Sequence, residues 1–225
     1  MNQQSWRRKP IAPEHLRARL RHVRWIGGGS GAGKTTVARK LAADHGLRLY
    51  SCDDSIAEHA RRSHPADEPL LHAFLAMSMD ERWANRSPSE MFERFPWFQG
   101  EGFGLILGDL LALPREPQIV VEGFRLLPRL VAPLLSRPNQ AVWLIPTPEF
   151  RRAAFDRRGF TWDIPRKTSN PERALSNLLA RDQLFTDEVF KGATALRLPT
   201  IAVDGTLGAD ELAWRVGAGL GLRAL

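Results

Sequence analysis

A glycine-rich stretch at residues 28–35, Gly28-Gly29-Ser30-Gly31-Ala32-Gly33-Lys34-Thr35, constrains this chain more than any other feature. It fits the pattern G-x-x-x-x-G-K-[ST], in which backbone N–H groups and a lysine bind phosphates. Val23, Trp25 and Ile26 predict a short strand before it, and residues 34–45 have helical spacing after it. We therefore expect a strand, a phosphate-binding turn and a helix in succession.

Phosphate binding explains these residue types. Glycines let the backbone curl so that successive N–H groups face one anion, and the N-terminus of the helix adds the positive end of its dipole. Lys34 supplies a full charge, and the hydroxyl of Thr35 can ligate Mg²⁺. A glycine-rich linker that ends by chance in Gly-Lys-Thr is the alternative, and the flanking strand and helix argue against it. The predicted nucleotide-binding residues are Gly28, Gly29, Ser30, Gly31, Ala32, Gly33, Lys34, Thr35 and Thr36.

Composition leaves the partner open but limits the class of protein. The chain has 225 residues, of which 43% are hydrophobic and 25% charged, enough for one sizeable α/β domain. Its net charge is +7, and only five of its 32 basic residues are lysines. This charge indicates either a solvated arginine-rich surface or an anionic ligand such as a nucleotide, a phosphorylated substrate or a nucleic acid.

The cellular location follows from what the sequence lacks. Cys52 is the single cysteine, so the chain has no internal disulfide, which favours a reducing compartment. The sequence shows no signal-peptide pattern and no apolar run of membrane-spanning length. We expect a cytoplasmic protein with no membrane partner.

Four further apolar segments alternate with helical ones. Residues 47–52, 118–123, 141–145 and 200–203 predict strands, and with the first strand they predict a five-stranded parallel sheet flanked by helices. Helices are expected at 124–135, returning beneath the sheet, at 171–195 and at about 210–220.

Acidic residues follow two of these strands. Asp53 and Asp54 come after the second strand, and Ser55 with Glu58 predicts a capping box that opens the next helix. Glu122 ends the third strand. Ligands of open α/β sheets bind beyond the carboxyl ends of the strands, so these acids should face the phosphate site. Asp109 lies in a segment with helical spacing and is expected to be an ordinary surface residue of a helix.

Two regions lie outside the regular alternation. Residues 55–112 show no strand pattern and predict several short helices, which form an insertion that covers a substrate. The aromatic residues between positions 83 and 103 either build a satellite core or line a pocket, and we expect the core for most of them. Residues 1–22 predict a basic tail that ends in a short helix from Pro13.

Taken together, these features resemble P-loop kinases that act on small molecules. The chain is similar to the uridine kinase, phosphoribulokinase and chloramphenicol phosphotransferase group of the nucleotide-kinase-like superfamily. The matching elements are GGSGAGKTT at 28–36, the Asp53-Asp54 pair, VVEG at 120–123 and the arginine-rich region 151–181, which includes Arg181-Asp182. The resemblance implies a single P-loop NTPase-type domain over residues 1–225, with ATP and Mg²⁺ bound.

The resemblance also implies roles for individual residues. Residues 28–35, with Lys34, would hold the ATP phosphates, and Thr35, Asp53 and Glu122 would serve the Mg²⁺ ion. Asp53, with Asp54 as the second candidate, would accept the proton of the acceptor hydroxyl, from a position beside the strand that feeds the glycine-rich turn. The region 151–181 would carry a lid over residues 151–170, whose Arg157, Arg158 or Arg166 reaches the transferred phosphate.

The acceptor is not specified by the sequence, and alternatives remain. A nucleoside, a sugar, a cofactor precursor or an antibiotic-like metabolite would each fit a small-molecule kinase. The net charge of +7 also suits a nucleic-acid-directed kinase or an ATP-using nucleic-acid-binding protein. A P-loop ATPase or regulatory switch is a further alternative, although the chain lacks a strand that ends in Asp-Glu.

Overall fold

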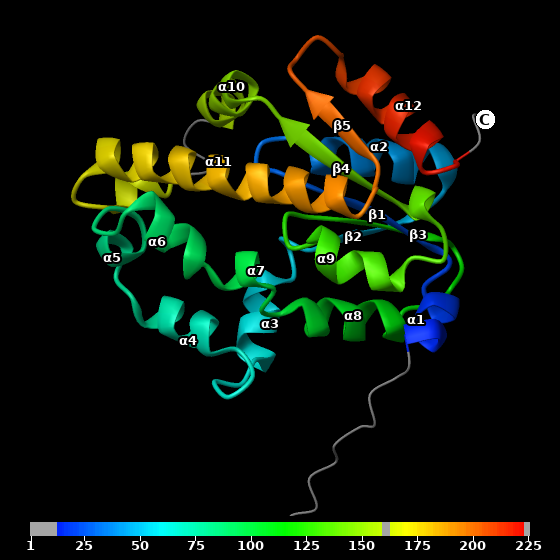
Figure 1. Cartoon of the computed structure of the whole chain (residues 1–225), viewed down its shortest axis with the longest axis horizontal. Helices are drawn as coiled ribbons and strands as arrows, with labels where there is room; N and C mark the ends of the chain where they lie inside the picture. Colours follow the sequence, from blue (N-terminus) through cyan, green and yellow to red (C-terminus); the bar gives the residue numbers. More distant parts are fainter. Residues whose placement is uncertain (1–12, 159–162, 223–225) are drawn as a thin grey trace, which may run out of the picture.

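A five-stranded parallel sheet forms the centre of the protein (Figure 1). The structure, a computed structural model, describes residues 13–158 and 163–222. The strands lie in the order β2-β3-β1-β4-β5, and every neighbouring pair is parallel. They are β1 (Val23–Gly28), β2 (Arg48–Ser51), β3 (Ile119–Glu122), β4 (Ala141–Pro146) and β5 (Thr200–Val203). The predicted α/β class and parallel sheet are confirmed.

Helices cover both faces of this sheet and build the insertion between β2 and β3. The α-helices are α1 (Pro13–Arg19), α2 (Lys34–His45), α3 (Ile56–Arg62), α4 (Pro69–Ala76), α5 (Met79–Trp83), α6 (Pro88–Glu93), α7 (Pro96–Gln99), α8 (Phe103–Ala112), α9 (Pro128–Val131), α10 (Pro148–Arg158), α11 (Pro171–Ala195) and α12 (Ala209–Gly219). Short 3₁₀ helices occur at η1 (Ala132–Leu134), η2 (Pro138–Gln140) and η4 (Pro165–Lys167).

The side chains of the strands alternate between two hydrophobic cores. Trp25, Val121 and Trp143 face the core that contains α11 and the insertion. Their neighbours Ile26 and Val120 face the other core, which α2 and α12 complete. In Figure 1, α11 crosses the near face of the sheet and α2 lies behind it. Both faces of the central strands are therefore covered, as a parallel sheet requires.

The strand order corrects one expectation from the sequence. β2 was expected beside the strand that leads into the glycine-rich turn, but β3 lies between β2 and β1. Glu122, the last residue of β3, pairs in register with Ile26 on one side and with Ser51 on the other. The acid next to the glycine-rich turn is therefore Glu122, and Asp53 reaches the same edge from one strand further away.

Two local predictions are wrong. The segment 124–135 is not one helix: its regular parts are α9 and η1, which begin at or next to prolines Pro128 and Pro133. Proline lacks a backbone N–H and disrupts helical hydrogen bonding, so the segment cannot form a continuous helix. Ser55 forms no capping box either, because its hydroxyl donates to the Cys52 carbonyl instead.

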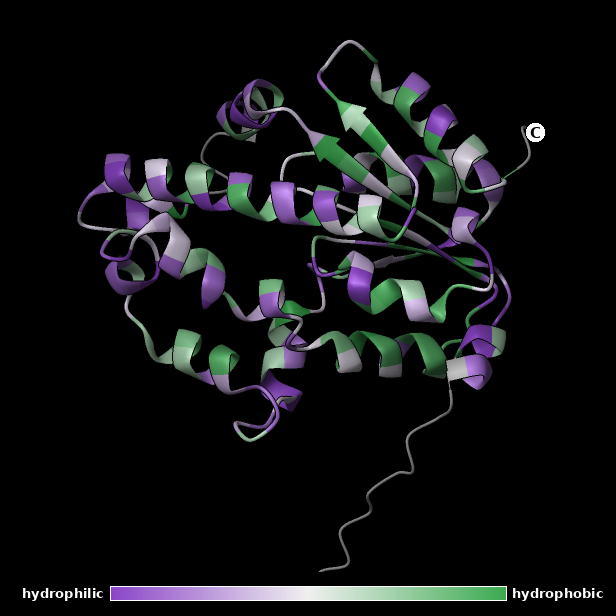
Figure 2. Cartoon of the chain, in the orientation of Figure 1, coloured by the Kyte–Doolittle hydropathy of each residue, from purple (hydrophilic) through white to green (hydrophobic). Residues whose placement is uncertain are grey.

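The insertion forms short helices, as predicted, and two of them have genuine capping boxes. Ser78 with Glu81 caps α5, and Ser87 with Glu90 caps α6. Apolar residues of α8 pack in the α11-side core, and Figure 2 shows α8 as largely hydrophobic and α10 as largely hydrophilic. The aromatic cluster of the insertion is thus continuous with the main core rather than a separate satellite.

Asp109 is a helix residue, as expected, but it is not an ordinary surface side chain. Its carboxylate receives hydrogen bonds from Tyr50 and Arg62 and lies 2.7 Å from His59 Nε2. Asp109 therefore ties β2 and α3 to α8.

Within the described residues, no helix is long and apolar enough to cross a membrane. The first 12 residues of the expected basic tail lie outside the described residues.

His22, just before β1, predicts a specific loss of stability at acid pH. Both of its ring nitrogens are buried and have no hydrogen-bond partner within the described chain. Burial, reinforced by the positive charge of Arg115, lowers the pKa of His22 below the ordinary histidine value of 6.5. His22 therefore binds a proton more readily in the unfolded chain than in the folded chain. Its contribution to stability is lost as pH falls below about 6.5.

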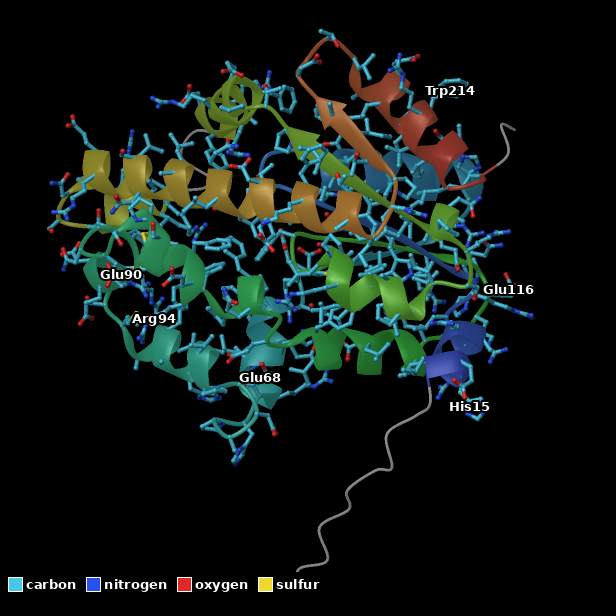
Figure 3. All side chains as sticks on the ribbon, viewed as in Figure 1. His15, Glu68, Glu90, Arg94, Glu116 and Trp214 are labelled. Atoms are coloured by element: carbon cyan, nitrogen blue, oxygen red, sulfur yellow. The ribbon has the colours of Figure 1, made fainter. Side chains whose placement is uncertain are left out.

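We expect His22→Gln to reduce the fall in unfolding free energy between about pH 7 and pH 5. Urea denaturation across this range would measure the effect. His15, an exposed histidine on α1 (Figure 3), gives the matched control His15→Gln, which should follow the wild-type pH dependence. An unchanged pH dependence in His22→Gln would contradict the prediction.

Candidate functional site

The glycine loop, residues 28–35, lies at the carboxyl end of the central strand β1. Gly28 has φ +127°, and a Cβ there would lie 2.1 Å from the carbonyl oxygen of Leu144, so only glycine fits this close approach. β1 has β3 on one side and β4 on the other. The chain leaves β1 towards β2 at one edge and leaves β3 towards β4 on the other side of β1. Open α/β sheets bind ligands at such a point, where the connections from neighbouring strands run in opposite directions.

Lys34 closes the glycine loop on itself. It is the first residue of α2, and its Nζ donates to the carbonyl oxygens of Gly28 over 3.2 Å and Gly29 over 2.8 Å. The side chain is buried. The loop therefore holds a charged ammonium at the N-terminus of a helix, where both the charge and the helix dipole attract anions.

Glu122 and Thr35 meet beside this lysine. The Thr35 hydroxyl donates to Glu122 Oε1 over 3.2 Å. Glu122 is 1% exposed, and its Oε2 has no hydrogen-bond partner among the described residues. Burial raises the pKa of Glu122; Lys34 lowers it and the carboxylate of Asp53 raises it. At this edge of the sheet, Glu122 therefore interacts electrostatically with Lys34 and Asp53 and accepts a hydrogen bond from Thr35.

A cavity of about 510 Å³, which we call the aromatic cavity, opens on one side of the glycine loop. Its polar wall comes from the loop, from the turn after β2 and from α11. Its apolar wall comes mainly from the insertion. The lining residues are Ser30, Gly31, Ala32, Gly33, Lys34, Thr35, Thr36, Asp53, Ile56, Phe74, Trp83, Phe95, Trp97, Phe98, Phe124, Ile164, Arg181 and Asp182.

A second cavity of about 780 Å³, the outer cavity, lies against the same loop. It shares Gly31, Ala32, Gly33 and Thr36 with the aromatic cavity, so the glycine loop separates the two spaces. Its other walls come from α10, from the end of β5 and the turn after it, and from α12. They include Glu149, Phe150, Ala153, Ala154, Arg157, Val203, Asp204, Gly205, Leu207, Ala209 and Leu212.

The structure separates the two predicted acids after β2. Both side chains are exposed, but Asp53 lines the aromatic cavity, whereas Asp54 lines neither of the two cavities. Both lie in the turn between β2 and α3 rather than on the strand, which ends at Ser51. Asp53 is therefore the acid that this geometry brings to Lys34, Thr35 and Glu122.

The predicted lid arginines are not all at the loop. Arg157 lines the outer cavity, and its guanidinium carbon lies 5.6 Å from the ring centroid of Phe150. Arg166 lines neither cavity; its side chain is 60% exposed and lies 3.4 Å from Asp163. Arg158 ends α10, and its side chain lies outside the described residues, as does the segment 159–162 of the predicted lid.

Several residues of the site were not predicted from the sequence. The apolar wall contains Phe74, Phe124 and Ile164 in addition to aromatic residues of the segment 83–103. More of those aromatics line a cavity than the sequence indicated, because helices far apart in the chain converge on α11. The turn at Asp204 and Gly205 carried a detectable signal, since it is an acidic-glycine pair at the carboxyl end of a strand.

Arg125 joins the insertion to the turn that carries Asp53. It is 1% exposed, donates through Nη1 to the Cys52 carbonyl and through Nη2 to the Gly102 carbonyl. The N–H of Gly102 in turn donates to Glu68 over 2.7 Å. Arg125 was expected in the helix 124–135, with no role in the site. Its buried contacts join the turn that carries Asp53 to the residue that precedes α8.

The donor set does not form a metal site made of protein ligands alone. Among the described residues, no group of three or more His, Cys, Asp and Glu side chains is placed to hold an ion. The predicted ligands Thr35, Asp53 and Glu122 offer one hydroxyl and two carboxylates. Mg²⁺ commonly binds through one or two carboxylates and completes its shell with water and phosphate oxygens, which is what this set allows.

Comparisons with known proteins add little to this geometry. No protein-family model matches the chain, and no curated protein does. Among solved structures, it is similar to an uncharacterized protein from Eubacterium ventriosum, with 16% sequence identity and a TM-score of 0.46. The match covers 89% of this chain and 98% of that one. A likeness at this level carries no information on activity.

The role of Arg125 leads to a prediction about the insertion. Arg125→Met should leave the carbonyls of Cys52 and Gly102 without these partners, which costs about 1–3 kcal/mol of unfolding free energy. Hydrogen exchange within residues 55–112 should accelerate. Arg129→Met is the matched control, because Arg129 donates to the Phe98 and Gln99 carbonyls but is exposed. Equal effects of the two substitutions would argue against a special role for Arg125.

Proposed function

We propose that this protein is a phosphotransferase that moves the γ-phosphate of MgATP to a hydroxyl group of a small molecule. One observation carries the proposal: the glycine loop lies between two cavities, and the acid Asp53 lines only the aromatic one. A transfer enzyme needs a place for the donor, a place for the acceptor and a phosphate-binding element between them. The earlier resemblance to P-loop kinases agrees with this arrangement.

In this proposal the glycine loop is a P-loop. Its N–H groups and the Lys34 ammonium bind the phosphates, and the nucleoside part of ATP occupies the outer cavity beside Phe150 and Arg157. The acceptor occupies the aromatic cavity on the other side of the loop. The γ-phosphate then sits at the boundary that both cavities share.

Magnesium fits the residues at this boundary. Glu122 has a buried oxygen without a hydrogen-bond partner in the described chain, and the Thr35 hydroxyl already lies against its other oxygen. Thr35, Glu122 and Asp53 would hold the ion, directly or through its water molecules. When bound, Mg²⁺ neutralises charge on the phosphate oxygens. Lys34 supplies positive charge from the protein at the same place.

Asp53 is the proposed general base. It accepts the proton of the acceptor hydroxyl while that oxygen forms a bond to the γ-phosphorus, and the bond from phosphorus to the bridging oxygen of ADP breaks. Its position on the aromatic cavity supports this role, and Asp54 does not line that cavity. Positioned bases typically contribute on the order of 10²–10⁴ in rate.

Arginines of the lid would supply further positive charge. Arg151 is held in place, since its guanidinium donates to Gln183 over 2.8 Å and to Thr186 over 2.6 Å. Arg157, Arg158 and Arg166 are the cations that the proposed lid over residues 151–170 would carry to the phosphate. Closure of this segment over the nucleotide would bring them to the transferred phosphate, as lids commonly do.

The lining of the aromatic cavity favours a small-molecule acceptor over a nucleic acid as the partner. Its apolar wall comes from at least six aromatic side chains, Phe74, Trp83, Phe95, Trp97, Phe98 and Phe124. Four of these rings form one network, in which Phe74, Trp97 and Phe98 each make an edge-to-face contact with Phe95. A nucleic acid strand is bound through its phosphates by cationic grooves, and this wall offers apolar surface instead.

Substitutions at Lys34 and Asp53 separate binding from transfer. Lys34→Met should weaken MgATP binding by roughly 10- to 100-fold, because a charged partner of the phosphates is lost. Asp53→Asn should bind MgATP normally and lose transfer by about 10²–10⁴. Calorimetry measures the first effect. Transfer from γ-labelled ATP into a metabolite extract, resolved by mass spectrometry, measures the second and identifies the acceptor.

Asp54→Asn is the matched control for the base and should retain near wild-type transfer. Full transfer in Asp53→Asn together with none in Asp54→Asn would move the base by one residue. Release of free phosphate without any labelled acceptor would favour an ATPase or a switch. Unchanged MgATP binding in Lys34→Met would refute the proposed P-loop.

The position of Arg157 gives a prediction for the donor side. Arg157→Ala should weaken MgATP binding about tenfold, because it removes a cation that lines the outer cavity. Arg152→Ala is the control on the same helix, since the Arg152 side chain is 57% exposed and pairs with Asp156. A loss confined to acceptor KM in Arg157→Ala would place the nucleoside elsewhere.

A further inference from the structure

The aromatic cavity contains a buried ion pair that the proposed transfer steps do not use. Arg181 and Asp182 are adjacent on α11, are 4% and 1% exposed, and both line the cavity. Arg181 Nε donates to Asp182 Oδ1 over 2.9 Å, and Nη2 donates to the same oxygen over 2.5 Å. One edge of the guanidinium is therefore satisfied by a single carboxylate oxygen.

Two polar atoms of this pair remain without a hydrogen-bond partner. Arg181 Nη1 and Asp182 Oδ2 are both buried, and neither has a partner among the described residues. Native proteins satisfy nearly all buried polar groups, so each exception calls for an explanation. Here the two atoms belong to side chains that line a cavity, which makes a bound ligand the natural partner: an acceptor group for Nη1 and a donor group for Oδ2.

Aromatic rings surround the guanidinium on its other sides. Its central carbon lies 4.3 Å from the ring centroid of Phe95, and 5.1 Å from the centroids of Trp83 and of Phe98. The negative faces of these rings stabilise the positive charge in addition to Asp182. The rings also give the cavity flat apolar surfaces, against which a planar group of a ligand can stack.

The charges of the described lining residues come in two balanced groups. Lys34 and Asp53 lie at the end formed by the glycine loop and the β2 turn, and Arg181 with Asp182 forms the other charged group. In the proposed reaction Lys34 serves the phosphates of ATP, and Arg181 is already neutralised by Asp182. An acceptor that carries its own phosphate would lose the hydration of that phosphate on entering the cavity. The described lining offers no uncompensated cation to replace the lost water, so binding of the phosphate is strongly unfavourable.

We propose that the acceptor is an uncharged alcohol with a planar apolar ring, whose polar groups pair with Arg181 Nη1 and Asp182 Oδ2. Phosphorylated sugars, nucleotides and nucleic acid strands are excluded from this cavity. A volume of about 510 Å³ suits such a molecule, since small-ligand sites typically measure about 300–1,000 Å³. The role of this molecule as a phosphate acceptor rests on the proposed function, but recognition of its ring by this cavity does not.

Binding by the full-length protein tests the inference without any transfer step. The probes are uncharged aromatic alcohols, such as 2-(4-hydroxyphenyl)ethanol and larger alcohols with fused rings, each paired with its own phosphate ester. Ligand-observed NMR and calorimetry without nucleotide would measure affinity. We expect the best uncharged members to bind at least about tenfold more tightly than their esters.

Variants then test the role of the ion pair. The double variant Arg181→Met/Asp182→Leu removes both charges together, which buried pairs often tolerate, and it should weaken binding of the best alcohol about tenfold or more. Asp182→Asn, which keeps the side-chain volume, is a second route if the double variant does not fold. Lys191→Met, at an exposed position of the same helix, should leave binding unchanged.

The outcomes distinguish this inference from the proposed function. Tighter binding of the phosphate esters, no binding of any uncharged ring alcohol, or undiminished binding by folded variants of the pair would overturn it. Pair-dependent binding of an uncharged alcohol would support it. If that alcohol binds but never receives phosphate from MgATP, the phosphotransferase proposal fails while the assignment of the cavity stands.

Discussion

The close approach of the backbone at Gly28 is the constraint on which the site depends. β1 runs so near to β4 that a Cβ at Gly28 would lie 2.1 Å from the Leu144 carbonyl oxygen. One at Gly29 would lie 2.5 Å from the Thr186 hydroxyl, which also receives a hydrogen bond from Arg151. The start of the loop is thus pressed between the sheet, α11 and α10. This confinement places the Lys34 ammonium and the N-terminus of α2 at one defined point.

A second constraint fixes the far wall of the site. The insertion α3–α8 adds no strand to the sheet; its apolar side chains pack into the α11-side core, and buried hydrogen bonds attach it further. Arg125 reaches from the segment after β3 to the Cys52 and Gly102 carbonyls. Asn177 on α11 donates to the carbonyls of Trp83, Ala84 and Arg86. Because buried carbonyls need such partners, these contacts hold the aromatic residues against α11 and keep a cavity between them.

The combination of these walls gives the site two chemically different ends. The glycine loop contributes N–H groups and an ammonium, which suit phosphate oxygens. The insertion and α11 contribute aromatic faces and an internally neutralised ion pair. A molecule that spans both ends would carry its reactive hydroxyl near Asp53 and its apolar part among the rings. The proposed chemistry and the proposed acceptor class both follow from this polarity of one cavity.

Predictions from the sequence succeeded where the signal is local. Residues 34–45 and 171–195 form helices with the predicted limits, since apolar spacing identifies both, Gly46 stops the first and Pro171 starts the second. The predictions failed where local patterns compete. Ser55 has a capping-box sequence, but its hydroxyl finds the Cys52 carbonyl, and the prolines in 124–135 interrupt a segment with helical apolar spacing.

The sequence by itself determined the parallel α/β class, the glycine-rich turn between β1 and α2, the acid that ends β3 and the acids that follow β2. These depend on backbone conformation and on residues close together in the chain. Only the tertiary structure decided that β3 separates β2 from β1, that Asp53 and not Asp54 lines the cavity, and that Arg181 lies among three aromatic rings. Such facts depend on contacts between segments up to about a hundred residues apart, and local patterns carry no information on which distant side chains will pack together.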